Sequence, residues 1–335
     1  MSEIAVVNVC PSLLAEGHAT FSPTALKMLF DGRRVSHLLP FESPASESAD
    51  GNKAVKNAGR LSLSGAQPKF GLVIGEDSFL RYSLEGEQST YIMKPRPTGY
   101  HVINHDYCMA NENLTMQMAS QIYGIETAPN GLCVFSDGAL AYITRRFDVH
   151  PSGKYAQEDF AALMGFTKEH GGSDFKHING SYEECAEVIR KYVSAAAVDV
   201  LRFFRVVLFN YITLNDDAHL KNFTLVNYGN EYRLSPAYDL VNTSLHIREP
   251  RIFALEKGLF REGMDLSDSH QDFLRDFREF GQRIDLPSKI VDKEIGRFST
   301  PSPGADALIK RSFLSDELKQ MYLRGYHYRQ ATLRP

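Results

Sequence analysis

The chain has 335 residues, of which 43% are hydrophobic and 23% charged, and its formal net charge is −4. This composition is typical of a globular protein with one large domain or two lobes. The acidic balance gives no electrostatic case for nucleic acid as the main ligand. No signal peptide or membrane-length apolar run is found, and four scattered cysteines without a C-x-x-C pair argue against a zinc site and a disulfide framework. These features predict a cytoplasmic protein.

The first 60 residues are expected to form a small N-terminal segment followed by a linker. Residues 4–9 are apolar enough for a short strand. Ser22 followed by Pro23 is a typical helix start, with a capping side chain and a proline at the first helical position. Residues 42–60 are small, polar and aperiodic, which indicates a mobile linker.

A loop of small residues precedes the first of three predicted strands. Residues 62–74 read SLSGAQPKFGLVI, and their second half alternates between apolar and other residues as strands do. A loop with Gly65 and Ala66 can bring backbone N–H groups close to phosphates. It matches neither G-x-G-x-x-G nor a Walker A sequence, so a simple turn stays an alternative. Further strands are predicted over 78–82 and 89–94.

The third of these strands ends in a lysine, Lys94, after an apolar run. An ammonium group is rarely buried without a partner, and Lys94 stands where a kinase strand lysine would reach nucleotide phosphates. The alternative is a lysine that extends to solvent from a strand edge. Glu112, at the start of a helix predicted over 112–124, is a candidate partner, because a helix glutamate holds the strand lysine in kinases. Alternatively, Glu112 only favours the helix dipole.

The middle of the chain passes from strands to helices. A hairpin over 131–135 and 139–144 would complete a five-stranded lobe. Helices are predicted over 158–166, 182–193 and 197–214, the last one apolar over most of its surface and therefore a core helix. Its apolar stripe is Val198, Leu201, Phe204, Leu208 and Tyr211. Later stripes are Phe273, Phe277 and Phe280, then Val291, Ile295 and Phe298, then Leu318 and Tyr322 in a helix from about Ser315.

Polar residues gather directly after the core helix. Asp217 and Asn222 have the spacing D-x-x-x-x-N, which matches the second half of the protein-kinase catalytic loop. In such loops the Asp accepts the proton of the attacking hydroxyl and the Asn binds a metal ion. A hairpin predicted over 223–234 would bring Asn222 close to Asp239, a second oxygen ligand suited to Mg²⁺. The spacing alone also occurs in ordinary loops, and Asp216 stands beside Asp217, so the choice of base depends on distances to His219 and Asn222.

The order of these motifs resembles the HipA family of bacterial toxin kinases. The resemblance rests on S-L-S-G-A-Q-P-K, the strand ending I-M-K-P, N-E at the helix start, R-R-F-D, D-x-H-x-x-N-F and the trailing Y-D, in this order over about residues 62–330. It implies an α+β fold with two protein-kinase-like (HipA-like) lobes, a β-rich N-lobe over 61–148 and an all-α C-lobe over 149–335. Residues 1–60 do not resemble the HipA N-terminal subdomain, a feature similar to HipT, the short kinase of three-component HipBST systems.

The resemblance implies ATP and Mg²⁺ as cofactors and gives each motif a role. Asp217 would be the catalytic base, and His219 would lie near the transferred phosphate. The Mg²⁺ ligands would be Asn222 and Asp239, and Glu112 would support Lys94. The residues implied in nucleotide binding are Ser64, Gly65, Ala66, Gln67, Lys94, Arg145, Phe147 and His219, with Arg145 and Phe147 offering hinge backbone to adenine.

The implied activity is that of a serine/threonine protein kinase, the toxin of a type II toxin–antitoxin system. Its substrate would be an aminoacyl-tRNA synthetase, and its partners antitoxin proteins resembling HipS and HipB, with DNA reached only through HipB and no membrane involved. Autophosphorylation of Ser62 or Ser64 would place negative charge where ATP binds and so inactivate the enzyme.

Two alternatives to this function stay open. One is a lipid or small-molecule kinase of the phosphatidylinositol-kinase-like group. The other is a non-catalytic subunit of an antitoxin complex. Leu240 and Val241 replace the Phe-Gly of an ordinary kinase, and no A-P-E follows. We therefore do not expect this protein to be regulated by an activation loop in the way that eukaryotic protein kinases are.

Overall fold

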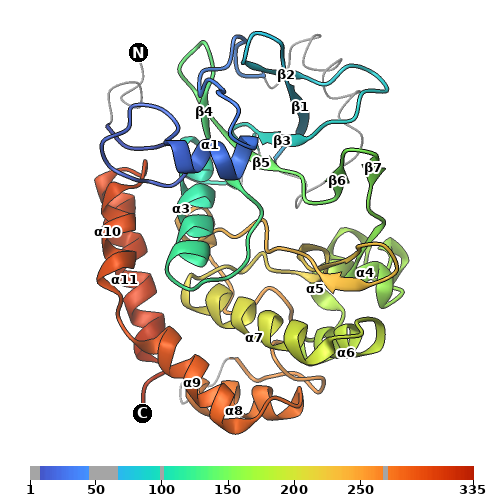
Figure 1. Ribbon diagram of the computed structural model, residues 1–335. Helices are drawn as coiled ribbons and strands as arrows, with labels where there is room; N and C mark the ends of the chain where they lie inside the picture. The colour runs from blue at the N-terminus through green and yellow to red at the C-terminus, as the bar shows by residue number, and fades with distance from the viewer. Residues whose placement is uncertain (1–7, 45–66, 99–101, 267–270) are drawn as a thin grey trace.

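The computed structural model describes residues 8–44, 67–98, 102–266 and 271–335, and it divides into a β-rich N-lobe and a helical C-lobe (Figure 1). The N-lobe is built on a five-stranded antiparallel sheet in the order β2-β1-β3-β5-β4. Its strands are β1 (Phe70–Ile74), β2 (Leu80–Tyr82), β3 (Tyr91–Lys94), β4 (Asn130–Val134) and β5 (Leu140–Arg145). The predicted five-stranded lobe is therefore confirmed.

One face of this sheet is covered by the N-terminal segment. Helix α1 (Pro23–Phe30) begins as predicted: the Ser22 hydroxyl caps it by accepting the N–H of Ala25, and Pro23 takes its first turn. Leu29 is buried in one cluster with Met93 of β3. Residues 8–44 thus pack as part of the N-lobe. The strand predicted over 4–9 and the linker predicted over 42–60 fall largely outside the described residues.

The opposite face of the sheet is covered by α3 (Cys108–Gln121), which packs against β4 and β5. The helix begins four residues before the predicted start, so Glu112 lies in its second turn and is buried. The helix-dipole alternative for Glu112 is therefore wrong, because that effect is confined to the first turn. The early start was hidden because Tyr107, at the N-cap position, makes no side-chain cap.

The C-lobe is arranged around α7 (Ala196–Ile212), which runs across its middle (Figure 1). Phe204, Leu208 and Tyr211 are buried as predicted, but Val198 is 54% exposed, and the buried stripe begins at Val200. The other helices are α4 (Phe160–Leu163), α5 (Phe175–Ile178), α6 (Tyr182–Tyr192), α8 (Phe273–Arg283), α9 (Ser288–Ser299), α10 (Pro303–Arg311) and α11 (Asp316–Ala331). The predicted stripes of α8, α9 and α11 are buried, whereas α10 was not predicted.

Small sheets accompany the helices of the C-lobe. The predicted hairpin forms as β9 (Thr224–Asn227) and β10 (Tyr232–Leu234), and β8 (Gln157–Asp159) pairs with β9. The helix predicted over 158–166 is therefore wrong at its start, because these residues pair with a strand far along the chain. A two-stranded sheet of β6 (Val149–His150) and β7 (Gly153–Lys154) links the lobes.

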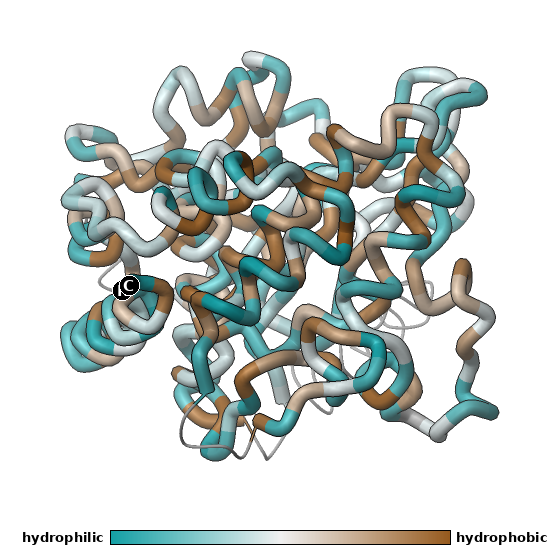
Figure 2. The backbone as a smooth tube through the Cα atoms, turned by 90° about the horizontal axis from the view of Figure 1, so that it is seen from below, coloured by the Kyte–Doolittle hydropathy of each residue, from teal (hydrophilic) through white to brown (hydrophobic). Residues whose placement is uncertain are grey.

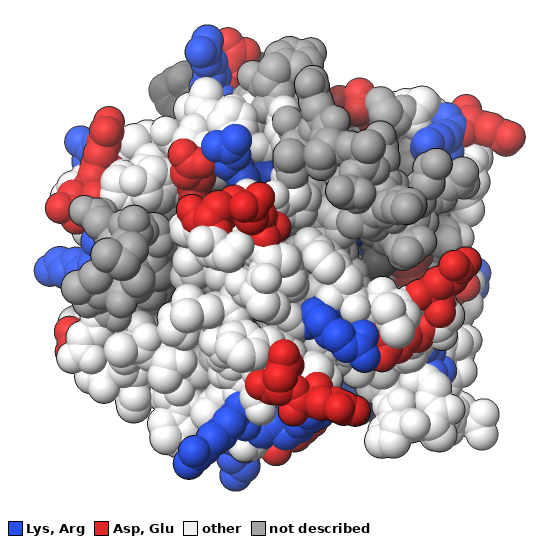
Figure 3. Space-filling view, turned by 90° about the horizontal axis from the view of Figure 1, so that it is seen from above, with Lys and Arg blue, Asp and Glu red and all other residues white. Residues whose placement is uncertain are grey.

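The distribution of polar, apolar and charged residues over the structure is that of a globular protein, as the composition predicts. Figure 2 shows hydrophilic and hydrophobic stretches alternating along the helices of the C-lobe, as amphipathic helices require. Acidic and basic side chains are interspersed on the face shown in Figure 3. None of the helices in the described ranges combines the length and apolarity needed to cross a lipid bilayer. All four cysteines are free thiols.

Candidate active site

Four charged side chains from both lobes form a buried ionic cluster, defined here as Lys69, Lys94, Glu112 and Asp239. The Lys94 Nζ atom lies 2.5 Å from Glu112 Oε1 and also contacts Asp239 Oδ1. Lys69 Nζ lies 3.4 Å from the other Asp239 oxygen. Lys94 is 1% exposed and Glu112 is 6% exposed. Two cations and two carboxylates therefore compensate one another away from water.

The strand geometry explains how Lys94 reaches this cluster. Side chains alternate across a strand, and Tyr91 and Met93 are packed in the core beneath α1. Lys94 consequently points to the opposite face, where its ammonium lies 5.2 Å from the ring centre of Tyr142 on the neighbouring strand. The prediction that Lys94 pairs with Glu112 is confirmed as geometry, and the strand-edge alternative is wrong.

The shifts in pKa follow from this pairing. Burial by itself lowers the pKa of Lys94, but the carboxylates of Asp239 and Glu112 outweigh it and raise that pKa. Burial raises the pKa of Asp239, yet Lys69 and Lys94 reverse the effect and lower it to about 2. Burial raises the pKa of Glu112 to about 6 although Lys94 opposes the shift. Asp239 is thus the carboxylate held most firmly in its charged form.

A polar loop follows α7 and carries the other predicted residues. The side chain of Asn215 accepts the backbone N–H of Asp217 at 3.1 Å, which fixes the turn. The neighbouring Asp216 faces away and accepts the N–H of Arg251 at 2.8 Å. Asp217 lies beside His219, with 3.8 Å between Asp217 Oδ1 and His219 Nε2. These contacts favour Asp217 over Asp216 as the reactive carboxylate.

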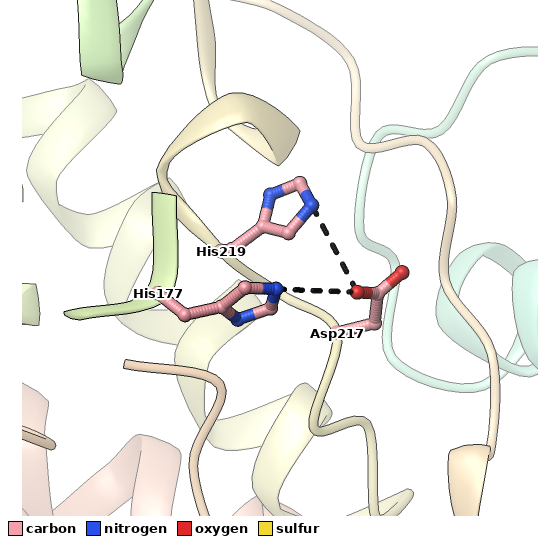
Figure 4. Close-up of side chains that lie close together, drawn as sticks. All are labelled: His177, Asp217 and His219. Carbon is pink, nitrogen blue, oxygen red and sulfur yellow. Dashed lines mark ion pairs between the residues drawn. The ribbon is translucent and has the colours of Figure 1, made fainter. Parts of the chain in front are cut away.

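A second histidine joins this loop from α5. His177 Nε2 lies 3.9 Å from the same oxygen of Asp217, and the two imidazole rings meet edge to face at 4.8 Å (Figure 4). We call His177, Asp217 and His219 the acceptor cluster. Burial lowers the pKa of both histidines, that of His219 well below its usual value. Both imidazoles are consequently neutral near pH 7.

Asn222 and Asp239 line one cavity of about 310 Å³ together with Lys69, Lys94 and His219. The cavity lies between the lobes, and its volume suits a small-molecule ligand. Asn222 Oδ1 is buried and has no hydrogen-bond partner in the part of the chain that the structure describes. An amide oxygen beside a carboxylate fits the oxygen ligands that Mg²⁺ prefers.

The far end of the cavity is lined by Ile92, Ala128, Arg145 and Phe147. The backbone N–H of Arg145 is donated to the carbonyl of Pro129 at 2.8 Å. Arg145 could therefore offer adenine its carbonyl but not its N–H, and the hinge contact of Arg145 and Phe147 stays a prediction. Its guanidinium faces away and lies 2.5 Å from Asp31.

The predicted phosphate loop is described only at its last residue. The side-chain amide of Gln67 donates to the carbonyl of Pro95 at 2.8 Å, which ties the loop to the strand that carries Lys94. The predictions for Ser62, Ser64, Gly65 and Ala66 lie outside the described residues.

Two residues of the site were missed by the sequence analysis. Lys69 had a signal, because it is the last residue of the S-L-S-G-A-Q-P-K motif and directly precedes β1, the strand that pairs with β3. His177 had none, because it lies 40 positions before Asp217 and only the packing of α5 brings it close.

A β-rich lobe whose lysine pairs with a helix glutamate, above a loop with Asp217 and Asn222, defines the protein-kinase-like class of folds. The chain belongs to the family of HipA-like C-terminal domains, whose model matches residues 61–302. A similar protein of Haemophilus influenzae, named "Putative kinase", is 27% identical over 352 residues, 98% of each chain. Another with this name, Y4mE of Sinorhizobium fredii, is 30% identical over 194 residues, 55% of this chain and 43% of that protein.

The fold is also shared with a solved structure. A chain in the complex of HipA, HipB and operator DNA from Shewanella oneidensis MR-1 aligns with a TM-score of 0.61 and 22% identity. The alignment covers 81% of this chain and 63% of that one. The predicted α+β, two-lobed, kinase-like fold is confirmed, with the small sheets as an addition to the helical C-lobe.

Proposed function

We propose that this protein is an ATP- and Mg²⁺-dependent serine/threonine protein kinase. The observation that supports it most strongly is the buried contact of Lys94 with both Glu112 and Asp239, at the edge of a cavity that Asn222 and His219 also line. Kinases need such a lysine–glutamate pair and an acidic metal ligand in place before they transfer a phosphoryl group. The names of the relatives point the same way.

Each residue has a role in the proposed reaction. The substrate hydroxyl attacks the γ-phosphorus, the bond to the β-phosphate oxygen breaks, and Asp217 accepts the hydroxyl proton. Lys94 orients the α- and β-phosphates and Glu112 positions it. Asn222 and Asp239 would hold Mg²⁺, which neutralises charge on the phosphates when bound. His219, as a neutral imidazole at the cavity wall, can donate a hydrogen bond to the transferred group.

The biological role is proposed from the family resemblance. The kinase would be the toxin of a toxin–antitoxin system and would phosphorylate an aminoacyl-tRNA synthetase. Its partners would be proteins resembling HipB and HipS, as HipA of Shewanella oneidensis occurs with HipB and operator DNA. Phosphorylation of Ser62 or Ser64, as in HipT, would add negative charge to the loop proposed to bind phosphate and so would repel ATP.

Intact-mass analysis after incubation with ATP and Mg²⁺ tests this proposal. We expect added phosphate on the wild-type chain, mapped by peptide analysis to Ser62 or Ser64. The initial rate should fall by about 10²–10⁴-fold in Asp217→Ala, the usual range for a lost general base. Asp216→Ala is the matched control and should stay within about tenfold of wild type.

The alternatives give different results in the same assay. Transfer of labelled phosphate to lipid vesicles but to no protein would favour the lipid-kinase function. If the chain starts free of phosphate and transfers none to itself, to a cell extract or to lipid, the kinase proposal is wrong.

A further inference from the structure

The acceptor cluster contains three groups whose ligand atoms lie around the same small region. His177 Nε2 and His219 Nε2 lie 3.9 and 3.8 Å from Asp217 Oδ1 (Figure 4). The ligand atoms of the three residues lie within 4.8 Å of one another. Each distance from the carboxylate exceeds that of a hydrogen bond, so the three groups face one another without bonding directly.

The tautomer of His177 follows from its second contact. His177 Nδ1 lies 2.9 Å from the carbonyl oxygen of Ala254. A carbonyl can only accept, so Nδ1 carries the proton and Nε2 presents its lone pair to Asp217. This backbone contact is the arrangement that orients metal-binding histidines in general.

His219 strengthens the same conclusion. Its ring is 2% exposed, and neither of its nitrogens has a hydrogen-bond partner in the described ranges. A buried imidazole without partners is costly. One cation placed between the three groups would give His219 a polar partner and would also bind the lone pair of His177 Nε2 and the carboxylate of Asp217.

We infer that His177, Asp217 and His219 form a binding site for a divalent transition-metal ion of the Zn²⁺ class, with water completing the coordination. Two nitrogens and one carboxylate oxygen suit such an ion better than Mg²⁺. Tetrahedral bonds of about 2.0–2.1 Å place ligand atoms about 3.4 Å apart. The separations of 3.8 and 3.9 Å from Asp217, and of no more than 4.8 Å within the whole set, therefore require the three side chains to close around the ion. This site departs from the sequence-based expectation, which argued against a zinc site from the cysteines alone, because none of the three ligands is a cysteine.

The bound ion would inhibit the proposed kinase, a consequence that rests on the proposed function. The carboxylate of Asp217 cannot accept a proton while it binds the metal, so the general base is blocked. The site is also distinct from the Mg²⁺ ligands Asn222 and Asp239. Millimolar Mg²⁺ should therefore not displace the transition metal.

One neighbouring charge opposes this binding. Lys176 precedes His177, is half-buried, and acts electrostatically on both Asp217 and His219. Its positive charge repels a dication, so its removal should tighten binding. Lys176 thus supplies a variant whose expected effect has the opposite sign to loss of a ligand.

Titration of the untagged protein with Co²⁺, without nucleotide, tests the inference, because nitrogen- and oxygen-bound Co²⁺ absorbs visible light. We expect one saturable band per chain, removed by Zn²⁺ and unaffected by Mg²⁺. His177→Ala and His219→Gln should each weaken binding at least tenfold, and Lys176→Gln should tighten it. His37→Ala, in the N-lobe beside Thr20, should not change it. Circular dichroism confirms that each variant is folded.

The possible outcomes separate the two claims. Absence of a band in the wild type, or an equal band in both folded ligand variants, overturns the site. A band with no Zn²⁺ inhibition of phosphoryl transfer overturns only the inhibitory consequence. An inactive chain that still binds Co²⁺ with the expected variant pattern supports the site and contradicts the proposed function.

Discussion

The ionic cluster and the acceptor cluster both contribute to the lining of one cavity, the first through Lys69, Lys94 and Asp239 and the second through His219, and they are organised in opposite ways. In the ionic cluster, Lys94 lies between two carboxylates, and Lys69 supplies a second cation. In the acceptor cluster, two neutral imidazoles face a carboxylate at distances too long for hydrogen bonds. In the first set every charged group has a partner of opposite charge, whereas in the second both ring nitrogens of His219 lack a hydrogen-bond partner among the described residues.

The difference teaches that the groups that stabilise this site and the groups that can bind or react belong to different clusters. A closed set of buried charges holds the lobes in register, because each charge would be costly without the others. The acceptor cluster contains a buried imidazole, that of His219, without a hydrogen-bond partner in the described part of the chain, a feature typical of sites that bind or react. Substitutions in the two clusters should therefore affect folding stability differently.

Lys94→Met is expected to have the largest effect on stability. It leaves Glu112 and Asp239 buried without the cation they share, so the free energy of unfolding should fall by about 3–5 kcal/mol. Urea unfolding measures this loss. Asp217→Asn, in the acceptor cluster, is the matched control and should change stability by less than about 1 kcal/mol. Equal losses of unfolding free energy in the two variants would show that the two clusters do not differ in their contribution to stability.

Acid should weaken the ionic cluster through Asp239. Its pKa is lowered from 3.8 to about 2, because Lys69 and Lys94 outweigh the effect of burial. A carboxyl with a lowered folded-state pKa contributes stability above its unfolded pKa, and that contribution is lost as pH falls through the folded value. The stability difference between wild type and Asp239→Asn should shrink by about 2 kcal/mol between about pH 5 and pH 2. A difference that is independent of pH would contradict this.

His219→Leu tests whether the polar ring of the acceptor cluster contributes to folding stability. Replacing a buried polar ring that lacks partners with an apolar group of similar size should be neutral or stabilise the fold by up to about 1 kcal/mol. His246→Leu is the control, because His246 is equally buried but bonds to the carbonyl of Ile103. That variant should lose about 1 kcal/mol. Thermal unfolding in the absence of metal compares them.

Arg145→Ala should have the smallest effect on the free energy of unfolding. It therefore shows how much an exposed ion pair contributes, for comparison with the buried cluster. The side chains of Arg145 and Asp31 are 35% and 68% exposed, so solvent screens their ion pair. We expect a loss of at most about 1 kcal/mol, measured in a double-mutant cycle with Asp31→Ala. A coupling energy of about 3–5 kcal/mol, as large as the loss expected for Lys94→Met, would show that an exposed ion pair stabilises the fold as much as a buried one.

Much of the fold could be predicted because its signals are local. The alternation of β1, the hairpin of β4 and β5, and the aromatic stripe of α8 all lie within about a dozen neighbouring residues. The wrong predictions share one cause. β8 is a strand only because Val226 and Leu225 lie beside it, and Val198 is exposed only because α7 turns its other side to the core.

The candidate site also has features that depend on local sequence and features that depend on tertiary contacts. The sequence by itself determined which residues carry chemistry and in what order, because the spacing of Asp217 and Asn222 and the position of Lys94 are fixed by neighbours along the chain. Only the tertiary structure decided their partners. Lys94 meets Asp239 across 145 positions and His177 reaches Asp217 across 40, because such contacts depend on how the lobes and α5 pack against one another. Tertiary packing therefore decided which polar groups are paired with one another and which, like the ring nitrogens of His219, have no hydrogen-bond partner in the described part of the chain.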